Sequence, residues 1–538
     1  MSSPDLPTEL WLEILSYLPP HYILSLVGVN RILFELALDY KYREVQLIED
    51  DKETRRWFKA LCGGAGNRVK RLYVRPSFLP GMCSGEWEGE LLEEGDVPTS
   101  FAWVKTLLPA RPSAQAPNIN TSGLFDFPDS VTKLLKAASL SLHRCPNIQE
   151  ITIVLYDHHI THLFASFLNS IWENLGDRLK KLCVQTTLAK IPTILGGISL
   201  LTATGTTGGG LRNLEVFDLL ITNSRFPVTQ STTKAATTAI VDFVSTFKDT
   251  LTHISLSSIV EYDLTPLFQS LSTLDDPPKL TKFELWLILC PVTLSRPSAL
   301  SKFLQSTSST LTHLVLHPIP KFGIEVFFPH REQMKGFIGS ADFSNLSLPF
   351  VRRLEIGMKV DWGMNYPGGY RLGPTFPSLV RPRDGAKIGN GGIFTNLRAL
   401  KFKTSTSLTF REMEVLLQGS AGCLAELDVW VTTFNSELHQ LLAREAPTLE
   451  KLYLVYTTSP LCGLTIDAAD SRLYPQWKLK WVRIGNRGDC GEIHPHRFIS
   501  RVVARSASTS TVEIDGEYLC FCYRESSWAG LLGRSDSL

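Results

Sequence analysis

Alternating apolar and polar positions recur along most of the chain. The repeated unit is a hexad with apolar residues at its first, fourth and sixth positions, as in Leu179-Lys-Lys-Leu182-Cys-Val184. Twelve such hexads begin at Val69, Ile148, Leu179, Leu211, Leu251, Leu280, Leu311, Val351, Leu397, Leu424, Leu449 and Leu479. Because side chains alternate between the two faces of a strand, the fourth and sixth positions are expected to face a common core. The pattern therefore predicts one short strand per hexad.

Helical periodicity fills several of the intervals between hexads. It is clearest in residues 160–175, 239–247, 411–417 and 437–444. A strand, a helix and a second parallel strand form a unit that cannot bury its apolar face alone, so that neighbouring units must stack. We therefore expect an α/β fold in which a curved parallel sheet carries helices on its outer side.

A different pattern occupies the first fifty residues. Apolar residues at helical spacing predict three short helices. The first is capped by Asp5 or Thr8 and stopped by Pro19-Pro20, the second covers residues 22–29, and the third follows Asn30. Three helices of this size make a small core, so a partner is expected to cover the apolar side chains that they cannot bury. The alternative, which periodicity alone favours, is a helical cap on the repeats that follow.

Three short motifs in these helices resemble the F-box: Leu6-Pro7-x-Glu9-Leu10, then Ile14-Leu15-x-x-Leu18-Pro19, then Leu24-x-Leu26 and the residues up to Ala37. The chain departs from the usual motif at Val29 and Leu33 without adding charge. The resemblance implies docking on the Skp-type adaptor of Skp-cullin-F-box ubiquitin ligases. It also implies that the adaptor interface, or the small core beneath it, is formed by Leu6, Pro7, Leu10, Ile14, Leu15, Leu18, Leu24 and Leu26.

The hexad array looks like an irregular leucine-rich repeat, and F-box modules followed by such repeats form a known arrangement. The array departs from the family because most of its periods are longer than usual and the customary Asn after the strand is missing. We predict an F-box-like module at 1–50, a repeat array at 51–507, and a capping hairpin and tail at 508–538. Two long insertions interrupt the array, an acidic and then Pro/Ala/Ser-rich one at 79–130 and a Gly/Pro-rich one at 357–395.

The third, fifth and seventh hexad positions are expected to point away from the core and to form an exposed wall. At the Leu211 hexad these positions are Asn213, Glu215 and Phe217. Large aromatic residues and arginine dominate the energetics of many protein interfaces. The wall therefore predicts a protein-binding surface, with target-binding candidates Trp286, His313, Arg353, Trp430, Tyr453 and Trp481. The alternative for the charged positions is that they neutralise one another across neighbouring strands.

Charge and composition narrow the choice of partner and compartment. The chain has 54 Lys+Arg and 53 Asp+Glu, a net charge of +1, which disfavours nucleic acid as the main ligand. No apolar run approaches the ~20 residues that span a bilayer, and the acidic N-terminus is unlike a secretory signal. The ten cysteines have no regular spacing, as in proteins of reducing compartments. We expect a protein of the cytoplasm, the nucleus or both, with no membrane partner.

Motifs for catalysis or cofactor binding give no support for an enzyme. The glycine-rich segment at 205–210 lacks the Lys-Ser/Thr of a phosphate-binding loop, and no Gly-x-Ser-x-Gly elbow occurs. The spacing of Cys490, His494, His496, Cys520 and Cys522 matches no usual zinc site. We expect no cofactor and no metal, and a non-catalytic receptor that presents a protein target for ubiquitination. The alternatives are a repeat scaffold without a ligase role and an enzyme hidden in the long insertions.

Overall fold

The computed structural model divides the chain into two compact units, Met1–Leu280 and Thr281–Leu538, which are described separately. The structure describes residues 7–18, 20–26, 28–29, 31–79, 129–158, 160–176, 178–203, 211–225, 227–287, 292–318, 346–357, 394–403, 408–419, 423–433, 436–458 and 481–486.

The first unit begins with three short helices, α1 (Thr8–Ser16), α2 (Pro20–Ser25) and α3 (Arg31–Tyr42), which confirms that three helices are present. The second helix ends at Ser25, earlier than the predicted residue 29. Pro20 opens α2 because the first helical residue needs no backbone N–H donor. Leu33 and Ala37 lie one turn apart on α3 and are both buried, so they form the centre of a small core.

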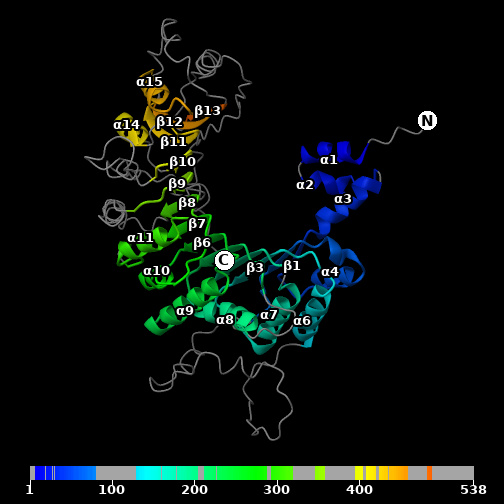
Figure 1. The fold of residues 1–538 in the computed structure, drawn as a ribbon. Coiled ribbons are helices and arrows are strands. Elements are labelled where there is room, and N and C mark those ends of the chain that lie inside the picture. Colours follow the sequence, from blue (N-terminus) through cyan, green and yellow to red (C-terminus); the bar gives the residue numbers. More distant parts are fainter. Residues whose placement is uncertain are drawn as a thin grey trace, which may run out of the picture. The chain divides into compact units, whose positions relative to one another are not determined.

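Among the described residues, six parallel strands follow in chain order: β1 (Glu44–Leu47), β2 (Arg71–Val74), β3 (Glu150–Leu155), β4 (Lys181–Thr186), β5 (Val216–Ile221) and β6 (His253–Ser258). Between them lie α4 (Lys52–Cys62), η1 (Ala65–Arg68), α6 (Asp129–Leu142), α7 (His162–Leu175), η2 (Leu188–Lys190), α8 (Ile191–Ala203) and α9 (Gln230–Thr246), and α10 (Thr265–Ser272) follows β6. Helices α6 to α9 lie side by side along one side of the strands (Figure 1).

The core of this unit lies between the strands and these helices. Phe217 on β5 meets Phe243 on α9 with ring centroids 4.6 Å apart, and Trp172 on α7 is buried. Thr161 and Thr229 cap α7 and α9, since their side-chain oxygens accept from the amides of Phe164 and Thr232. Each helix thus turns an apolar face towards the strand that precedes it.

The second unit repeats this design. Its parallel strands are β7 (Lys282–Leu287), β8 (His313–Pro318), β9 (Arg353–Gly357), β10 (Ala399–Lys403), β11 (Glu426–Thr433), β12 (Lys451–Thr458) and β13 (Trp481–Asn486). The described helices are α11 (Pro297–Ser306), α14 (Phe410–Gly419) and α15 (Ser436–Glu445). The α/β class with parallel strands and intervening helices is therefore confirmed.

The register of one predicted strand is wrong. Lys181 pairs with Val216, so Phe217 points into the core instead of lying on the wall. This repeat begins at Leu214, three residues later than predicted, and its wall positions are Val216, Asp218 and Leu220 instead of Asn213, Glu215 and Phe217. Leu211 is also buried, which is why it was mistaken for the first position.

Strand β1 was not predicted. Its residues were assigned to the N-terminal module, but they pair with β2 from Glu44↔Arg71 to Leu47↔Val74. The sheet of the first unit therefore begins directly after α3.

The predicted insertions at 79–130 and 357–395 lie almost wholly outside the described residues, and the predicted hairpin and tail at 508–538 lie entirely outside them. No described helix has the length and apolar character needed to cross a bilayer.

Candidate functional site

Helices α1 to α3 carry apolar side chains that their own unit does not cover. Leu10 and Ile14, each 44% exposed, lie four residues apart on one face of α1. Leu24 on α2 and Phe34 on α3 are exposed to a similar degree. Single exposed apolar residues are normal, but a set on three consecutive packed helices is typical of an interaction surface.

The structure places most of the eight predicted adaptor-binding residues on this module. Pro7, Leu10, Ile14 and Leu24 are exposed, and Leu18 and Leu26 are partly exposed. Leu15 lies in α1, and its side chain is not among the described ones; Leu6 lies outside the described residues. The exposure of Leu10 and Ile14 is the property that a docking surface requires.

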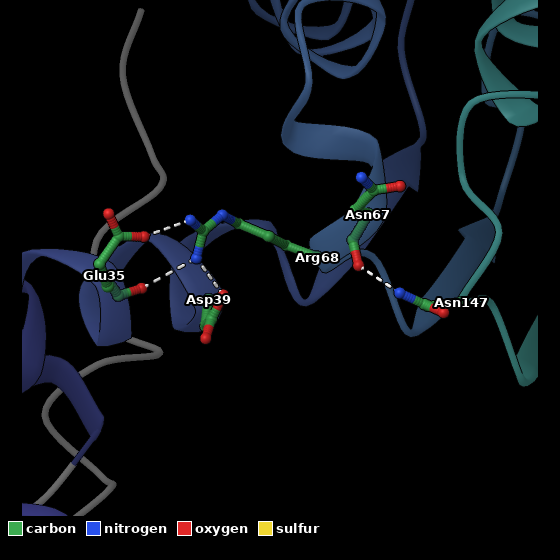
Figure 2. Close-up of polar contacts among 5 residues, drawn as sticks. All are labelled: Glu35, Asp39, Asn67, Arg68 and Asn147. Atoms are coloured by element: carbon green, nitrogen blue, oxygen red, sulfur yellow. Dashed lines mark hydrogen bonds and ion pairs between the residues drawn. The ribbon is translucent and has the colours of Figure 1, made fainter. Parts of the chain in front are cut away.

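Arg68 links helix α3 of this module to the η1 turn, which directly precedes strand β2 of the first unit. Arg68, at the end of η1, pairs with the carboxylates of Glu35 and Asp39 and donates from Nη1 to the Glu35 carbonyl oxygen at 3.1 Å (Figure 2). The hydrogen bond with Glu35, followed by that with Asp39, raises the pKa of Arg68 against the opposing effect of burial. The attachment therefore uses a polar face of α3 and does not engage Leu10 or Ile14.

The η1 turn is itself held against the segment after α6. Asn147 Nδ2 donates to the Asn67 carbonyl oxygen at 2.6 Å (Figure 2). A Cβ at Gly66 would lie 2.1 Å from the Arg144 carbonyl oxygen, so only glycine fits at this contact. Close backbone packing thus positions Arg68.

In the second unit the predicted target-binding residue Trp286 lies in a stacked pair. Its ring is 4.1 Å from that of His317 on the neighbouring strand, with an angle of 8° between the planes. His317 is buried, and its Nε2 lies 3.2 Å from Glu355 Oε1. Trp286 Nε1 also donates to Glu284 Oε2 at 3.4 Å. Trp286 is therefore a partly exposed aromatic residue whose orientation is fixed by its neighbours.

His313 and Arg353, two further predicted target-binding residues, are brought together on β8 and β9. Burial lowers the pKa of His313 to about 4, and the positive charges of Lys282 and Arg353 add to this effect. His313 is consequently neutral at pH 7 and adds no positive charge beside Arg353.

The stability of the protein is expected to fall as the pH drops from about 6.5 towards 4 through the titration of His313. In the unfolded chain the pKa of His313 is near its ordinary value of 6.5, so in this pH range the unfolded chain binds more protons than the folded protein. Urea denaturation at pH 7 and pH 5 measures the loss, and His313→Gln should reduce it because the titrating group is gone. An equal loss in both proteins would contradict this assignment.

Charged residues on the wall largely pair with one another. Arg353 Nη2 reaches Glu426 at 3.0 Å across Ala399, whose small side chain leaves room between β9 and β11. In the first unit, Arg71 meets Glu150 at 2.8 Å, and Lys181 meets Asp218 at 2.9 Å. Lateral neutralisation, the alternative weighed for these positions, therefore accounts for much of their charge.

Trp430 and Tyr453 lie on adjacent strands and are partly exposed. Tyr453 stands opposite Asp428, two residues before Trp430, so the two aromatic residues are diagonal neighbours on one face. Trp481 pairs with Lys451 in the backbone register, and its side chain is not among those described. The target-binding role of these residues remains a prediction.

Two wall residues of the first unit were missed as candidates, Arg75 and Tyr156. Arg75 occupies the seventh position of the Val69 hexad, so the alternation that identified the other wall residues also applies to it.

In the part of the chain that the structure describes, no group of three or more His, Cys, Asp or Glu side chains could hold a metal ion. The cysteines and histidines considered for zinc, from Cys490 to Cys522, lie outside this part.

The N-terminal helices match a known family model. Residues 3–42 match the model of the F-box domain. These residues form an F-box domain. The match begins before α1 and ends with α3, so the F-box domain contains all three helices and the exposed Leu10 and Ile14.

No curated protein matches the sequence. Among solved structures, the chain is similar to one described as the crystal structure of the Rad7 and Elc1 complex in yeast, with 13% identity over 66% of this chain and 83% of that chain. The TM-score is 0.31, a value at which the likeness carries no argument about fold or partners.

Proposed function

We propose that this protein is the target-recognition subunit of a Skp-cullin-F-box ubiquitin ligase. The F-box domain would dock on a Skp-type adaptor, and the repeat array would hold a protein target. The observation that carries the proposal is the F-box match at 3–42 together with the exposure of Leu10 and Ile14 on its first helix. An interface of standard size buries about 800 Å² on each partner.

The proposed mechanism is one of proximity and orientation. The chain supplies binding surfaces, and the ubiquitin transfer belongs to other subunits of the complex. Partly exposed aromatic residues on the wall, such as Trp286, Trp430 and Tyr453, support a role in target binding because interface energy concentrates in such side chains. We place this activity in the cytoplasm, the nucleus or both.

Removal of residues 1–43 tests the proposal against the alternative of a repeat scaffold. This deletion ends just before β1 and leaves in place all the strands that the structure describes. We expect the truncated protein to lose only the helical circular dichroism signal of α1 to α3, to keep a cooperative thermal unfolding transition, and to lose co-purification with a Skp-type adaptor and a cullin. The intact chain, expressed in parallel, is the control.

The scaffold alternative makes the opposite prediction. If the helices only cap the array, their removal should unfold the first unit, and the intact chain should retain neither adaptor nor cullin. Either result would argue against the proposed function.

A further inference from the structure

Helix α4 presents a face of basic side chains to solvent. Lys52, Arg56 and Lys59 are all exposed, and they follow the i, i+4, i+7 spacing that places side chains on one side of a helix. We refer to these three residues as the α4 basic face. The buried Phe58 and Leu61 lie on the opposite side of the helix, so the basic face takes no part in the core.

The charges of the α4 basic face have no acidic partner among the described residues. No carboxylate there forms an ion pair with any of the three side chains, and Glu53 is the only acidic residue of the helix. The fourth basic residue of α4, Arg55, is already paired, since its Nε lies 2.9 Å from Asp50 Oδ1. Three neighbouring positive charges create a local potential that favours an acidic ligand.

An aromatic pair with a further cation borders this face. Trp57 is partly exposed, and its ring meets that of Tyr42 edge-on with the centroids 5.1 Å apart. Lys41 is exposed, and its Nζ lies 5.9 Å from the centroid of the Trp57 ring. The contact with the ring holds this lysine beside α4, where it extends the positive surface.

The chain itself carries a segment of the opposite charge. Residues 86–96 contain no lysine, arginine or histidine, and six of these eleven residues are acidic: Glu86, Glu88, Glu90, Glu93, Glu94 and Asp96. The segment lies outside the described residues. A run of like charges repels itself, and contact with cations relieves that repulsion.

The described chain leads to this segment from a point beside the start of α4. Leu79, the last described residue before the segment, is buried, and the Ser77 amide donates to the Ile48 carbonyl oxygen at 2.9 Å. Ile48 precedes Lys52, the first residue of α4, by only four positions. The seven residues from Leu79 to Glu86 can span about 25 Å, whereas α4 is about 17 Å long. The acidic segment can therefore reach the whole basic face.

We propose that the α4 basic face binds the acidic segment 86–96 of the same chain. Charge complementarity selects this occupant over a neutral or basic one. The short connection to Leu79 gives the segment a high effective concentration at the face, so that an acidic ligand from another protein would have to displace it. This contact within the chain is independent of the proposed ligase role.

Carbodiimide cross-linking of the full-length protein tests the proposal, because this reagent joins an amine directly to a carboxylate without a spacer. Mass spectrometry of the digested protein should find Lys52 and Lys59 joined to residues of the segment 86–96. The yield should fall as salt is added, since salt screens exposed charges. The Lys248–Asp276 ion pair, with Nζ and Oδ2 2.9 Å apart, is the internal standard for comparing variants.

Arg56→Glu tests the role of charge on the basic face. It changes the face from three positive charges to one and leaves both reporter lysines in place, so the yield of these cross-links should fall about fivefold. Lys234→Glu is the matched control, because Lys234 is exposed on α9 and the net charge changes by the same amount. It should leave the yield unchanged. Thermal melting shows that both variants are folded.

A second variant leaves α4 unaltered. Replacement of Glu86, Glu88 and Glu90 by glutamine halves the charge of the segment and should lower the yield of cross-links to Glu93 and Glu94.

Three results would overturn the proposal. They are the absence of cross-links between the two lysines and the segment, an equal yield in Arg56→Glu and Lys234→Glu, and cross-links that join two copies in a mixture of isotope-labelled and unlabelled chains. Co-purification of a Skp-type adaptor is measured on the same samples, so a failure of this contact with the adaptor retained leaves the proposed function intact.

Discussion

Replacement of both Leu10 and Ile14 by aspartate is expected to abolish capture of a Skp-type adaptor. Each side chain is 44% exposed in the chain itself, so a carboxylate at either position remains in contact with water and leaves the fold intact. At an interface the same carboxylates would be buried without a partner, at a cost of several kcal/mol. Co-purification of the adaptor with each variant measures the effect, and thermal melting shows that the variant is folded.

The matched control for this experiment is Leu140→Asp. Leu140 is a leucine of the same unit that is 67% exposed, but it lies on α6, outside the F-box domain. This variant should capture the adaptor as the unaltered protein does. Undiminished capture by the Leu10/Ile14 double variant would rule out the docking surface.

Replacement of Phe243 by alanine should produce a large loss of stability in the first unit. Phe243 is fully buried on α9, and its ring lies 4.6 Å from that of Phe217 on β5 and 4.8 Å from that of Phe247. Truncation removes the contact between helix and sheet and leaves a cavity. Such Phe→Ala changes cost about 3–5 kcal/mol. Urea denaturation, followed by circular dichroism, measures the change in the free energy of unfolding.

Thr238→Ala serves as the control for Phe243→Ala, because Thr238 lies on the same helix and is exposed. Its effect should stay within about 0.5 kcal/mol. Phe243 lies outside the F-box domain, so the folded fraction of Phe243→Ala should still capture the adaptor. A loss below about 1 kcal/mol would show that α9 does not depend on this aromatic contact.

The positions of the strands could be predicted because each one carries the same alternation. Eleven of the twelve hexads have their third position at the first residue of a strand. The Leu211 hexad failed because a buried leucine outside the strand imitates the first position, while the alternation of Phe217, Leu219 and Ile221 marks the true register. Strand β1 was missed because Val45 and Leu47 follow α3 directly and continue its apolar pattern.

The candidate surfaces were only partly predictable. Exposure of Leu10 and Ile14 follows from the small size of the module, as argued from the sequence. The contact of Arg68 with Glu35 and Asp39 depends on how η1 packs against α3, and the neutral state of His313 depends on burial and nearby charges. Neither property is encoded in local spacing, so neither could be derived before the fold was known.

The pairing of β2 with β3 shows that a long insertion between two neighbouring strands is compatible with their pairing. Residues 75–149 separate these two strands, about three times the length of the 156–180 segment between β3 and β4, yet both pairs form in register. In the unfolded chain, the entropy cost of bringing the two ends of a segment together grows only with the logarithm of its length, so pairing across the longer connection costs about 1 kcal/mol more. Each connection can therefore become longer and change in sequence during evolution at little cost in the stability of the strand pair that it joins.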